Sequence, residues 1–322
     1  MDAEKKDIYF KIFRYNPEVD QESYFDEFKI SVEKGITILR AMNYIKDHVD
    51  PKLSYRFFCQ AGICGSCAMK VNGVAKLACT TQVWDELKKC KTPDVITIEP
   101  LGNLGVVRDM VINYNPVVDK LEKFMSWVEP AKKDSAFGEK EFIVAEKDFK
   151  IIDAATDCIL CASCYSECSI LDAHKDFVSP LVMLKAFRMN ADTRDTASQK
   201  RLNLLTKDHG IWDCTHCYKC VEACVKNIPI MDGIHGLRNS AMNRGMKGEG
   251  YRHADAFRKD IYNVGRLNEP LLLLRTKGIF KVIGMTSFTI KMALKGRLPS
   301  LFVKKIPGLK KVRELMRSTS KR

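Results

Sequence analysis

The most constraining feature of this sequence is a cysteine pattern that occurs twice between Cys158 and Cys224. In each copy, three cysteines are separated by two residues, and a fourth follows after three more. Three thiolates at this spacing wrap one iron–sulfur cluster, whereas the fourth reaches a neighbouring cluster in bacterial two-cluster ferredoxins. The two copies supply eight sulfurs, enough for two 4Fe–4S clusters. They are Cys158, Cys161, Cys164 and Cys168, followed by Cys214, Cys217, Cys220 and Cys224.

A zinc ribbon is the main alternative, because Cys-x2-Cys pairs also form tetrahedral zinc sites. Zinc pairs do not usually extend to a third and a fourth cysteine at this spacing, and here both pairs do. A disulfide framework is not expected, since a chain of 322 residues with 46% apolar residues buries a core without such staples. The pattern therefore favours iron–sulfur clusters.

A second cysteine pattern lies upstream and has the Cys-x4-Cys-x2-Cys spacing with a distant fourth cysteine that is typical of plant-type 2Fe–2S ferredoxins. A loop that wraps such a cluster turns its amides inward, which calls for small residues and for positive φ at some positions. Gly62 and Gly65 meet that need, and Asn72-Gly73 predicts a hairpin turn before the last ligand. The four cysteines are Cys59, Cys64, Cys67 and Cys79.

The periodicity of apolar residues divides the chain into parts. Residues 8–32 alternate like two strands of a hairpin, residues 95–98 resemble a closing strand, and Thr37 can cap a helix. The periodicity then becomes helical, as over residues 110–128 and 180–191. We predict an α+β chain with a 2Fe–2S ferredoxin-like domain at 1–108, an all-helical domain with two 4Fe–4S-type motifs at 109–270, including a surface excursion at 131–150, and a basic helical extension at 271–322.

The chain contains neither a Gly-x-Gly-x-x-Gly loop nor a Walker-type loop, so no flavin or nicotinamide site is predicted. The charged start of the sequence does not predict a secretory signal. The sequence contains no run of 18 apolar residues, so no membrane span is predicted. We therefore expect an electron carrier that forms part of an oxidoreductase and leaves the bond-breaking chemistry to a partner.

The basic character of the chain belongs to its C-terminal tail. Residues 271–322 hold 14 Lys and Arg and one acid, Glu314, and so carry the whole formal net charge of +13. On a single helical projection, Lys281, Lys291 and Lys295 fall in one sector, apart from most of the apolar residues. This arrangement fits an interfacial helix at an anionic membrane surface or docking onto a partner subunit. Nucleic-acid binding is not expected, because no aromatic–basic interleaving accompanies the charge.

Taken together, these motifs resemble the iron–sulfur subunit of succinate dehydrogenase and fumarate reductase. The resemblance implies a β-grasp fold for the N-terminal 2Fe–2S domain. It also implies a chain of three clusters between an FAD-containing flavoprotein subunit, where fumarate and succinate interconvert, and a quinone-reactive membrane-side subunit. The resemblance covers roughly residues 5–235 and includes Arg14-Tyr-Asn-Pro17, Cys64-Gly-Ser-Cys67, Arg108-Asp109, the stretch 180–195 that ends Ala-Asp-Thr-Arg-Asp, and Cys224-Val-Lys-Asn-Ile-Pro229.

The resemblance also assigns ligands position by position. It gives Cys59, Cys64, Cys67 and Cys79 to the 2Fe–2S cluster, Cys158, Cys161, Cys164 and Cys224 to the middle 4Fe–4S cluster, and Cys168, Cys214 and Cys220 to the family's usual 3Fe–4S centre. Here the sequence departs from the family, since Cys217 stands where most members have a non-ligating residue. Four thiolates can hold a complete cube, so a second 4Fe–4S cluster is predicted, with 3Fe–4S as the alternative. Ser169 and Val225 also replace the prolines that usually follow the fourth cysteines.

The extra cysteine and the long tail are similar to the atypical type E branch of the family. In that branch the membrane-side subunit is cysteine-rich and resembles heterodisulfide reductase. Residues 265–299 of the present chain also resemble the C-type subunit of heterodisulfide reductase. We therefore predict the electron-transfer subunit of a quinone-linked, methylmenaquinol:fumarate reductase-like complex. A thiol:fumarate reductase or heterodisulfide reductase-type complex is the alternative. The expected location is peripheral to a membrane on its cytoplasmic side, or on the periplasmic side if a signal-bearing partner exports the folded chain.

Three further residues have two interpretations each. His216 lies between two predicted ligands and is either a hydrogen-bond donor or proton relay for the third cluster, or an ordinary loop histidine. Trp212 either shields that cluster from water or packs in the core. Cys90 follows Lys88 and Lys89, which would lower its pKa, and is otherwise a bystander thiol.

Overall fold

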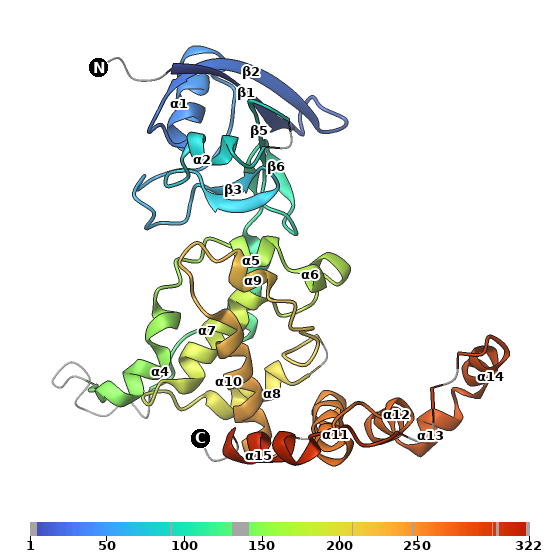
Figure 1. The fold of residues 1–322 in the computed structure, drawn as a ribbon. Helices are drawn as coiled ribbons and strands as arrows, with labels where there is room; N and C mark the ends of the chain where they lie inside the picture. Colours follow the sequence, from blue (N-terminus) through green and yellow to red (C-terminus); the bar gives the residue numbers. More distant parts are fainter. Residues whose placement is uncertain are drawn as a thin grey trace. The chain divides into compact units, whose positions relative to one another are not determined.

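The alternation of apolar residues near the N-terminus produces a long antiparallel hairpin in the structure of the chain, a computed structural model (Figure 1). Strand β1 (Lys5–Arg14) pairs along its whole length with β2 (Tyr24–Glu33). Ile8, Phe10 and Ile12 are fully buried, because alternate side chains of a strand face the same side of its sheet. The structure describes residues 5–90, 92–130, 142–207, 209–246, 248–297, 299–300 and 303–319.

Three more strands complete a five-stranded sheet of order β2-β1-β5-β3-β4. β5 (Val95–Glu99) runs parallel to β1 and antiparallel to β3 (Ala68–Val71), and β3 forms a hairpin with β4 (Val74–Leu77). Both Asn72 and Gly73 have positive φ, as a two-residue type I′ turn requires. The predicted turn before the last cysteine of the 2Fe–2S pattern is therefore confirmed.

Helix α1 (Ile38–His48) covers one face of this sheet (Figure 1). Its N-cap is Thr37, as predicted, and the Thr37 hydroxyl accepts a hydrogen bond from the amide of Arg40. Leu39 and Met42 of α1 share one buried core with the inward-facing residues of β1. A short helix, α2 (Val83–Leu87), follows β4.

Beyond β5 the chain forms a small second sheet and then helices. The two strands are β6 (Val106–Arg108) and β7 (Val111–Ile112). β7 occupies the start of the helix predicted at 110–128, so the observed helix begins later, after the Tyr114 N-cap, and it ends earlier, at Lys123. Of the predicted surface excursion at 131–150, residues 131–141 lie outside the described residues. The helices are α3 (Asn115–Lys123), α4 (Glu146–Thr156), α5 (Ser163–Ser166), α6 (Ser169–Ala173), α7 (Pro180–Ala191), α8 (Ser198–Leu205), α9 (Lys219–Glu222) and α10 (Ile230–Asn243).

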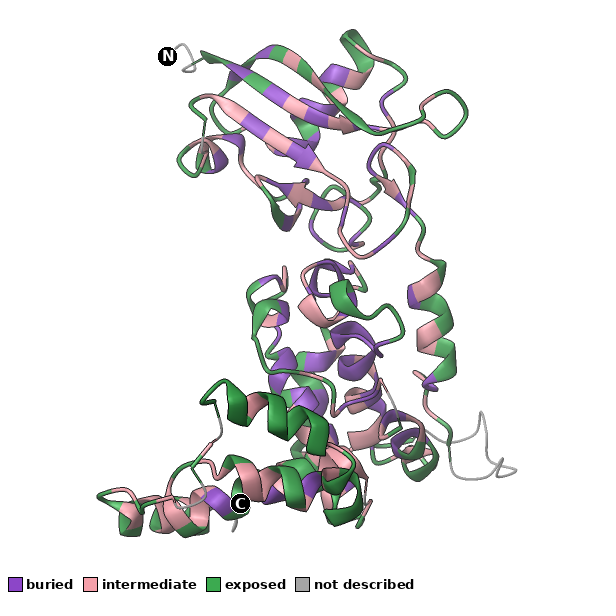
Figure 2. Ribbon diagram, turned by 90° about the vertical axis from the view of Figure 1, so that its right-hand side faces the viewer, coloured by how far each residue is buried: buried purple, intermediate pink, exposed green. Residues whose placement is uncertain are grey.

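Helix α7 is the central helix of this part and contacts α3, α4, α5 and α8. It begins as predicted at Pro180, and the Ser179 hydroxyl accepts a hydrogen bond from the amide of Val182. Most of its side chains are buried, and polar side chains such as those of Lys185 and Arg188 are partly buried. Figure 2 shows this concentration of buried residues around α7.

The chain divides into two compact units, residues 1–239 and 240–322. The first unit contains both ferredoxin-like parts and all the cysteines. The second begins at Ser240, upstream of the start of the predicted extension at 271. The domain boundaries at 108 and 270 remain predictions.

The second unit consists of helices with many exposed side chains (Figure 2). The buried Asp260 joins two of them, because its carboxylate accepts a hydrogen bond from Arg275 at 2.6 Å and one from the amide of Asn268 at 3.1 Å. None of its described helices, nor any other helix in the described ranges, is long and apolar enough to cross a membrane. The helices are α11 (Glu249–Val264), α12 (Glu269–Lys277), α13 (Ile279–Ile283), α14 (Thr286–Leu294) and α15 (Leu309–Thr319).

Candidate functional site

The first candidate site is the loop that carries the upstream cysteine pattern. The amides of Ala61, Ile63 and Cys64 point at the sulfur of Cys59 with N–S distances of 3.2–3.4 Å. The amide of Gly62 donates to the sulfur of Cys79 at 3.3 Å. The loop thus turns its backbone donors toward its sulfurs, as the spacing predicts. The positive φ angles of Gly62 and Gly65, 71° and 75°, are part of that turn.

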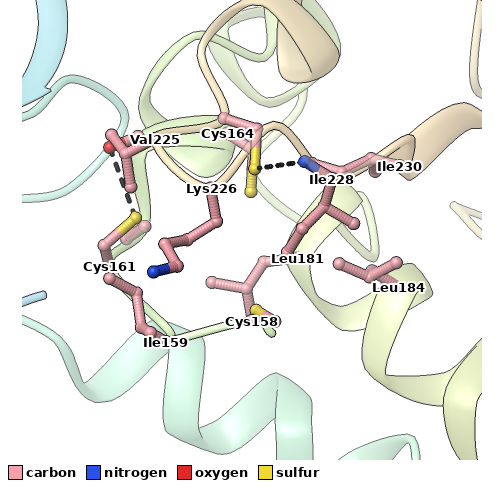
Figure 3. A pocket seen from close by; sticks show the side chains of 13 residues that line it. Cys158, Ile159, Cys161, Cys164, Leu181, Leu184, Val225, Lys226, Ile228 and Ile230 are labelled. Carbon is pink, nitrogen blue, oxygen red and sulfur yellow. Dashed lines mark hydrogen bonds between the residues drawn. The ribbon is translucent and has the colours of Figure 1, made fainter. Parts of the chain in front are cut away.

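The second candidate site combines both downstream motifs. Cys158, Cys161 and Cys164 of the first motif and Cys224 of the second line one small cavity (Figure 3). The amide of Ile228 donates to the sulfur of Cys224 at 3.3 Å. The other walls are mainly apolar and come from Ile159, Leu181, Leu184, Ile228 and Ile230.

The third candidate site has the converse composition. Cys214, Cys217 and Cys220 of the second motif line a second small cavity together with Cys168 of the first. Its remaining lining includes Phe177 and Met231, which are both buried. The structure therefore brings the eight downstream cysteines together in two groups of four, each with three from one motif and one from the other.

The two motifs repeat the same backbone conformation. Leu160 and Ala162 have φ angles of 56° and 63° in the first motif, and His216 and Tyr218 have 57° and 62° at the equivalent positions of the second. None of these residues is a glycine, and an L-residue in the left-handed region costs about 1–2 kcal/mol. The conformation is thus strained in both copies, and such strain is typical of functional sites. In this repeat Cys217 occupies the position of Cys161.

The donor set fits an iron–sulfur cluster at both downstream sites. Burial raises the pKa of Cys161, Cys168 and Cys214, raises that of Cys164 well above its usual value, and raises that of Cys220 to about 12. A buried thiolate therefore needs positive charge beside it, and a bound metal supplies this charge and deprotonates the thiol. Four sulfurs in a mainly apolar cavity are suited to iron–sulfur clusters or zinc.

The upstream site has mixed electrostatics. A hydrogen bond from the Ser66 hydroxyl, with backbone amides, lowers the pKa of Cys64 to about 6, whereas burial raises the pKa of Cys67 to about 12. Donors at the rim and a buried ligand inside are compatible with a cluster that lies at the protein surface.

The upstream loop contacts the first downstream motif through a glycine. A Cβ placed on Gly65 would lie 3.0 Å from the Cβ of Cys161 and 3.1 Å from the carbonyl oxygen of Ile159. The Tyr114 hydroxyl donates to the carbonyl oxygen of Leu160 at 2.5 Å in the same motif. The absence of a side chain at Gly65 thus lets two cysteine-bearing loops approach closely.

A second joint between the two ferredoxin-like parts is made by Asn103. Its side-chain amide donates to the carbonyl oxygens of Tyr165, Ser166 and Cys168 at 3.1, 2.9 and 3.1 Å. The amide of Gly102 donates to the Ser166 hydroxyl at 2.8 Å. The turn that follows β5 therefore fixes the helix that links Cys164 to Cys168.

Two arginines fix other loops, the buried Arg201 and the partly buried Arg238, and sequence reasoning missed both. Arg201 pairs with Asp195 at 2.8 Å, both side chains being fully buried, and also donates to the carbonyl oxygens of Met125 and Trp127. Arg238 donates to the carbonyl oxygens of Ile211, Trp212 and Cys214. An arginine that binds backbone carbonyls leaves no signature at the acceptor positions. The sequence offered no signal for either clamp.

Arg14 and Asp109, which belong to two of the motifs behind the resemblance, form an ion pair at 3.3 Å. Arg14 also binds Asp50 at 2.5 Å, and the buried Asp109 accepts hydrogen bonds from the amides of Tyr15 and Ser54. This network ties the end of β1 to the turn before β7. Its role in the structure is to hold the N-terminal part together.

The three residues with open interpretations are placed as follows. His216 is exposed and accepts a hydrogen bond from Arg238, and partial burial and this guanidinium lower the pKa of His216 to about 4. Trp212 is half-buried with the Arg238 guanidinium 5.3 Å from its ring centre. Burial raises the pKa of Cys90, so the neighbouring lysines do not lower it and the bystander interpretation is favoured.

Comparisons with known proteins agree with the geometry. Residues 9–119 match the family described as "2Fe-2S iron-sulfur cluster binding domain", and residues 154–228 match the "4Fe-4S dicluster domain". The chain is 33% identical over 301 residues to the 8-methylmenaquinol:fumarate reductase iron-sulfur subunit of Wolinella succinogenes, with 91% of each chain covered. It is also 33% identical to the fumarate reductase iron-sulfur subunit of Mycobacterium tuberculosis, over 74% of this chain and 95% of that one.

A solved structure has the same fold. A chain of the Mycobacterium smegmatis Sdh1 complex in the apo form superposes with a TM-score of 0.67 at 22% identity. The match covers 76% of this chain and 99% of the other. The similarity of fold thus extends over the whole of the shorter protein and leaves part of the present chain without a counterpart there.

Proposed function

Because the chain belongs to the iron–sulfur subunits of the succinate dehydrogenase and fumarate reductase family, we propose that it carries electrons between a flavoprotein subunit and a quinone-reactive, membrane-side subunit. The observation that supports this role most is the grouping of twelve cysteines into three sites within one compact unit. It is a subunit of an oxidoreductase complex and performs no substrate chemistry of its own. The flavoprotein partner, with FAD, would interconvert fumarate and succinate.

The proposed ligands follow the three groups. The upstream loop would hold the 2Fe–2S cluster, and the two crossed groups would each hold a 4Fe–4S cluster, which accepts and releases single electrons when bound. The shared cavity and the repeated backbone conformation support Cys217 as a fourth ligand of the third cluster, in place of a 3Fe–4S centre. The ligands are Cys59, Cys64, Cys67 and Cys79; Cys158, Cys161, Cys164 and Cys224; and Cys168, Cys214, Cys217 and Cys220.

The residues of the chain contribute placement and environment. The amides of the upstream loop stabilise negative charge on the sulfurs of Cys59 and Cys79, and the mainly apolar walls of the second site shield its sulfurs from water, whereas Cys217 at the third site is exposed. Asn103 and Arg238 bind backbone carbonyls of the cysteine-bearing segments, so these segments change little when charge arrives. A fixed environment lowers the reorganisation that accompanies electron transfer.

We assign the N-terminal sheet to the β-grasp class, on the strength of its mixed strand order with α1 across one face. The second unit would form the contact with the membrane side. Its α13 and α14 expose apolar residues such as Phe280 and Leu294 beside basic ones. The helical projection that placed Lys281 with Lys291 and Lys295 assumed one helix and is wrong. α13 ends at Ile283, and Lys281 pairs with Glu249 at 3.4 Å.

We propose that the partner on the membrane side is the cysteine-rich, heterodisulfide-reductase-like subunit of the type E branch. The present chain would then lie peripherally at the cytoplasmic face of the membrane. Exchanging Lys291 and Lys295 for Gln should weaken binding of the complex to membranes or to that subunit. The exposed Lys34 and Lys200 provide a control with the same loss of charge. Equal binding of both variants would contradict a role of the tail.

The decisive experiment is activity of the purified complex with alternative electron donors. Reduced menaquinol analogues should support fumarate reduction, and the activity should be lost when Cys64→Ala removes the 2Fe–2S EPR signal. Thiol-dependent fumarate reduction without quinol activity would instead support the heterodisulfide reductase-type alternative. A full 2Fe–2S signal in the Cys64→Ala variant would refute the ligand assignment.

A further inference from the structure

A group of metal-binding side chains lies outside the three cysteine sites. His174, Asp176 and His209 each offer one ligand atom, and these atoms lie within 4.8 Å of one another. The two imidazole rings stack with their centres 4.0 Å apart and an angle of 29° between their planes. The residues come from two loops that are distant in sequence, so the fold and not the sequence spacing brings them together.

The two loops are held in place by backbone contacts. The amide of Val178 donates to the carbonyl oxygen of His209 at 2.9 Å, and so joins them directly. The Lys120 ammonium donates to the carbonyl oxygens of Lys175 and Phe177 at 2.5 and 2.6 Å. The loop that carries His174 and Asp176 is thus fixed from both sides, which reduces the entropy that a bound ion would have to remove.

His209 has features of a metal ligand. Its φ is 60°, a left-handed conformation that costs a residue with a side chain about 1–2 kcal/mol. The carboxylate of Asp213 lies 3.5 Å from His209 Nδ1. A carboxylate beside the second ring nitrogen is the usual partner of a metal-bound histidine, because it fixes the ring and its tautomer. With Asp213 on Nδ1, Nε2 of His209 is left for an ion.

The donor set selects a class of metal. Two imidazoles suit zinc and the neighbouring late transition metals, whereas calcium and magnesium prefer oxygen ligands. Three protein ligands with a water as the fourth make a tetrahedral zinc site. Both His174 and Asp176 are exposed, so solvent has access for this water.

An ion bound by these three residues would lie next to the segments that carry Cys168 and Cys214. α6 connects Cys168 to His174, and the segment 209–213 connects His209 to Cys214. These two cysteines are the ones from different motifs that meet at the third cysteine site. We propose that His174, Asp176 and His209 bind a zinc ion, which ties together the two loops that supply this site. The effect on the third cluster rests on the proposed function, whereas the zinc binding does not.

The test is a zinc titration of purified, cluster-loaded protein, with elemental analysis of zinc and iron after desalting. One zinc per chain should be retained at unchanged iron content, and competition with a chromophoric chelator gives its affinity. His174→Gln and His209→Gln should lower the affinity at least tenfold, and Asp213→Asn about tenfold. His48→Gln is the matched control, because His48 is also exposed and stacks on an aromatic ring, that of Tyr44.

Zinc that stays bound in the histidine variants would lie at cysteines and would overturn the proposal, as would failure of the wild type to retain zinc at micromolar concentration. Asp176→Asn, a change of an exposed side chain, gives the same answer if a histidine variant does not fold. The iron content of the same samples reports on the proposed clusters independently, so a failure of either proposal is recognised separately. If both hold, zinc should slow the loss of iron on heating in the wild type and not in His209→Gln.

Discussion

Replacing Gly65 with alanine is expected to open the joint between the upstream cysteine loop and the first downstream motif. The added Cβ would lie 3.0 Å from Cys161 Cβ and 3.1 Å from the backbone of the same residue. Cβ atoms in folded proteins rarely approach so closely. The atoms it meets are backbone or the stem of a proposed ligand, so the loops must move apart.

The magnitude has two parts that can be separated. An L-residue at a positive φ lowers the stability of the fold by about 1–2 kcal/mol. Overpacking a close contact lowers it by about 1–3 kcal/mol more. Gly73→Ala carries the first cost alone, because Gly73 has a φ of 80° and nothing lies within 4 Å of its added Cβ. Gly62→Ala strains the same loop as Gly65→Ala but meets Thr80 of the same ferredoxin-like part. The two controls isolate the contribution of the joint.

The assay is thermal unfolding of the cluster-loaded protein, followed by the loss of visible absorption. Since about 1 kcal/mol corresponds to roughly 2–4 °C for a unit of this size, the Tm of Gly65→Ala should lie at least about 2 °C below that of Gly73→Ala. Microwave power saturation of the reduced 2Fe–2S EPR signal should also change in Gly65→Ala and not in the controls, because it reports the distance to the neighbouring paramagnet. Equal Tm values with unchanged saturation would refute this account of the joint.

Three further predictions concern single side chains. Cys217→Ser should lower the iron content from about 10 to about 9 per chain and produce the near-isotropic EPR signal of a three-iron centre, and an unchanged iron content would make Cys217 a spectator. Asp195→Asn leaves the guanidinium of Arg201 without its buried countercharge, so the free energy of unfolding should fall by about 3–5 kcal/mol. Burial lowers the pKa of Lys120 to about 8, so its unfolded form binds more protons above that pH, and the stability of the wild type relative to Lys120→Met should rise between pH 8 and 10.

The parts of the site that the sequence predicts are those in which side chains act at a fixed spacing. The three cysteine patterns, the Asn72-Gly73 turn and the alternation of β1 are of this kind, because chain geometry over a few residues determines them. The joints are different. Asn103 and Arg238 bind backbone carbonyls, and every residue has a carbonyl, so no pattern indicates which one is bound.

The tail shows a second reason for failure. A projection over residues 281–295 assumes an unbroken helix, but the chain ends α13 at Ile283 and restarts at Thr286. Gly284 lies at this break, and glycine costs a helix interior roughly 0.5–1 kcal/mol relative to alanine. Differences in helix propensity of a few tenths of a kcal/mol per residue decide where a helix breaks. The periodicity of apolar residues alone does not show such differences.

The repeated backbone of the two downstream motifs bears on how a four-sulfur third site arises. Position by position, Leu160 and Ala162 have the left-handed conformation that His216 and Tyr218 have in the second copy. The same backbone that directs Cys161 into the second site therefore presents Cys217 to the third, and both cysteines line their cavities. The loop could keep the same backbone conformation with a non-ligating side chain at this position. We infer that a single substitution is enough to change the number of thiolates at the third site, while the strain of the loop, its helix α9 and its clamp by Arg238 stay as they are.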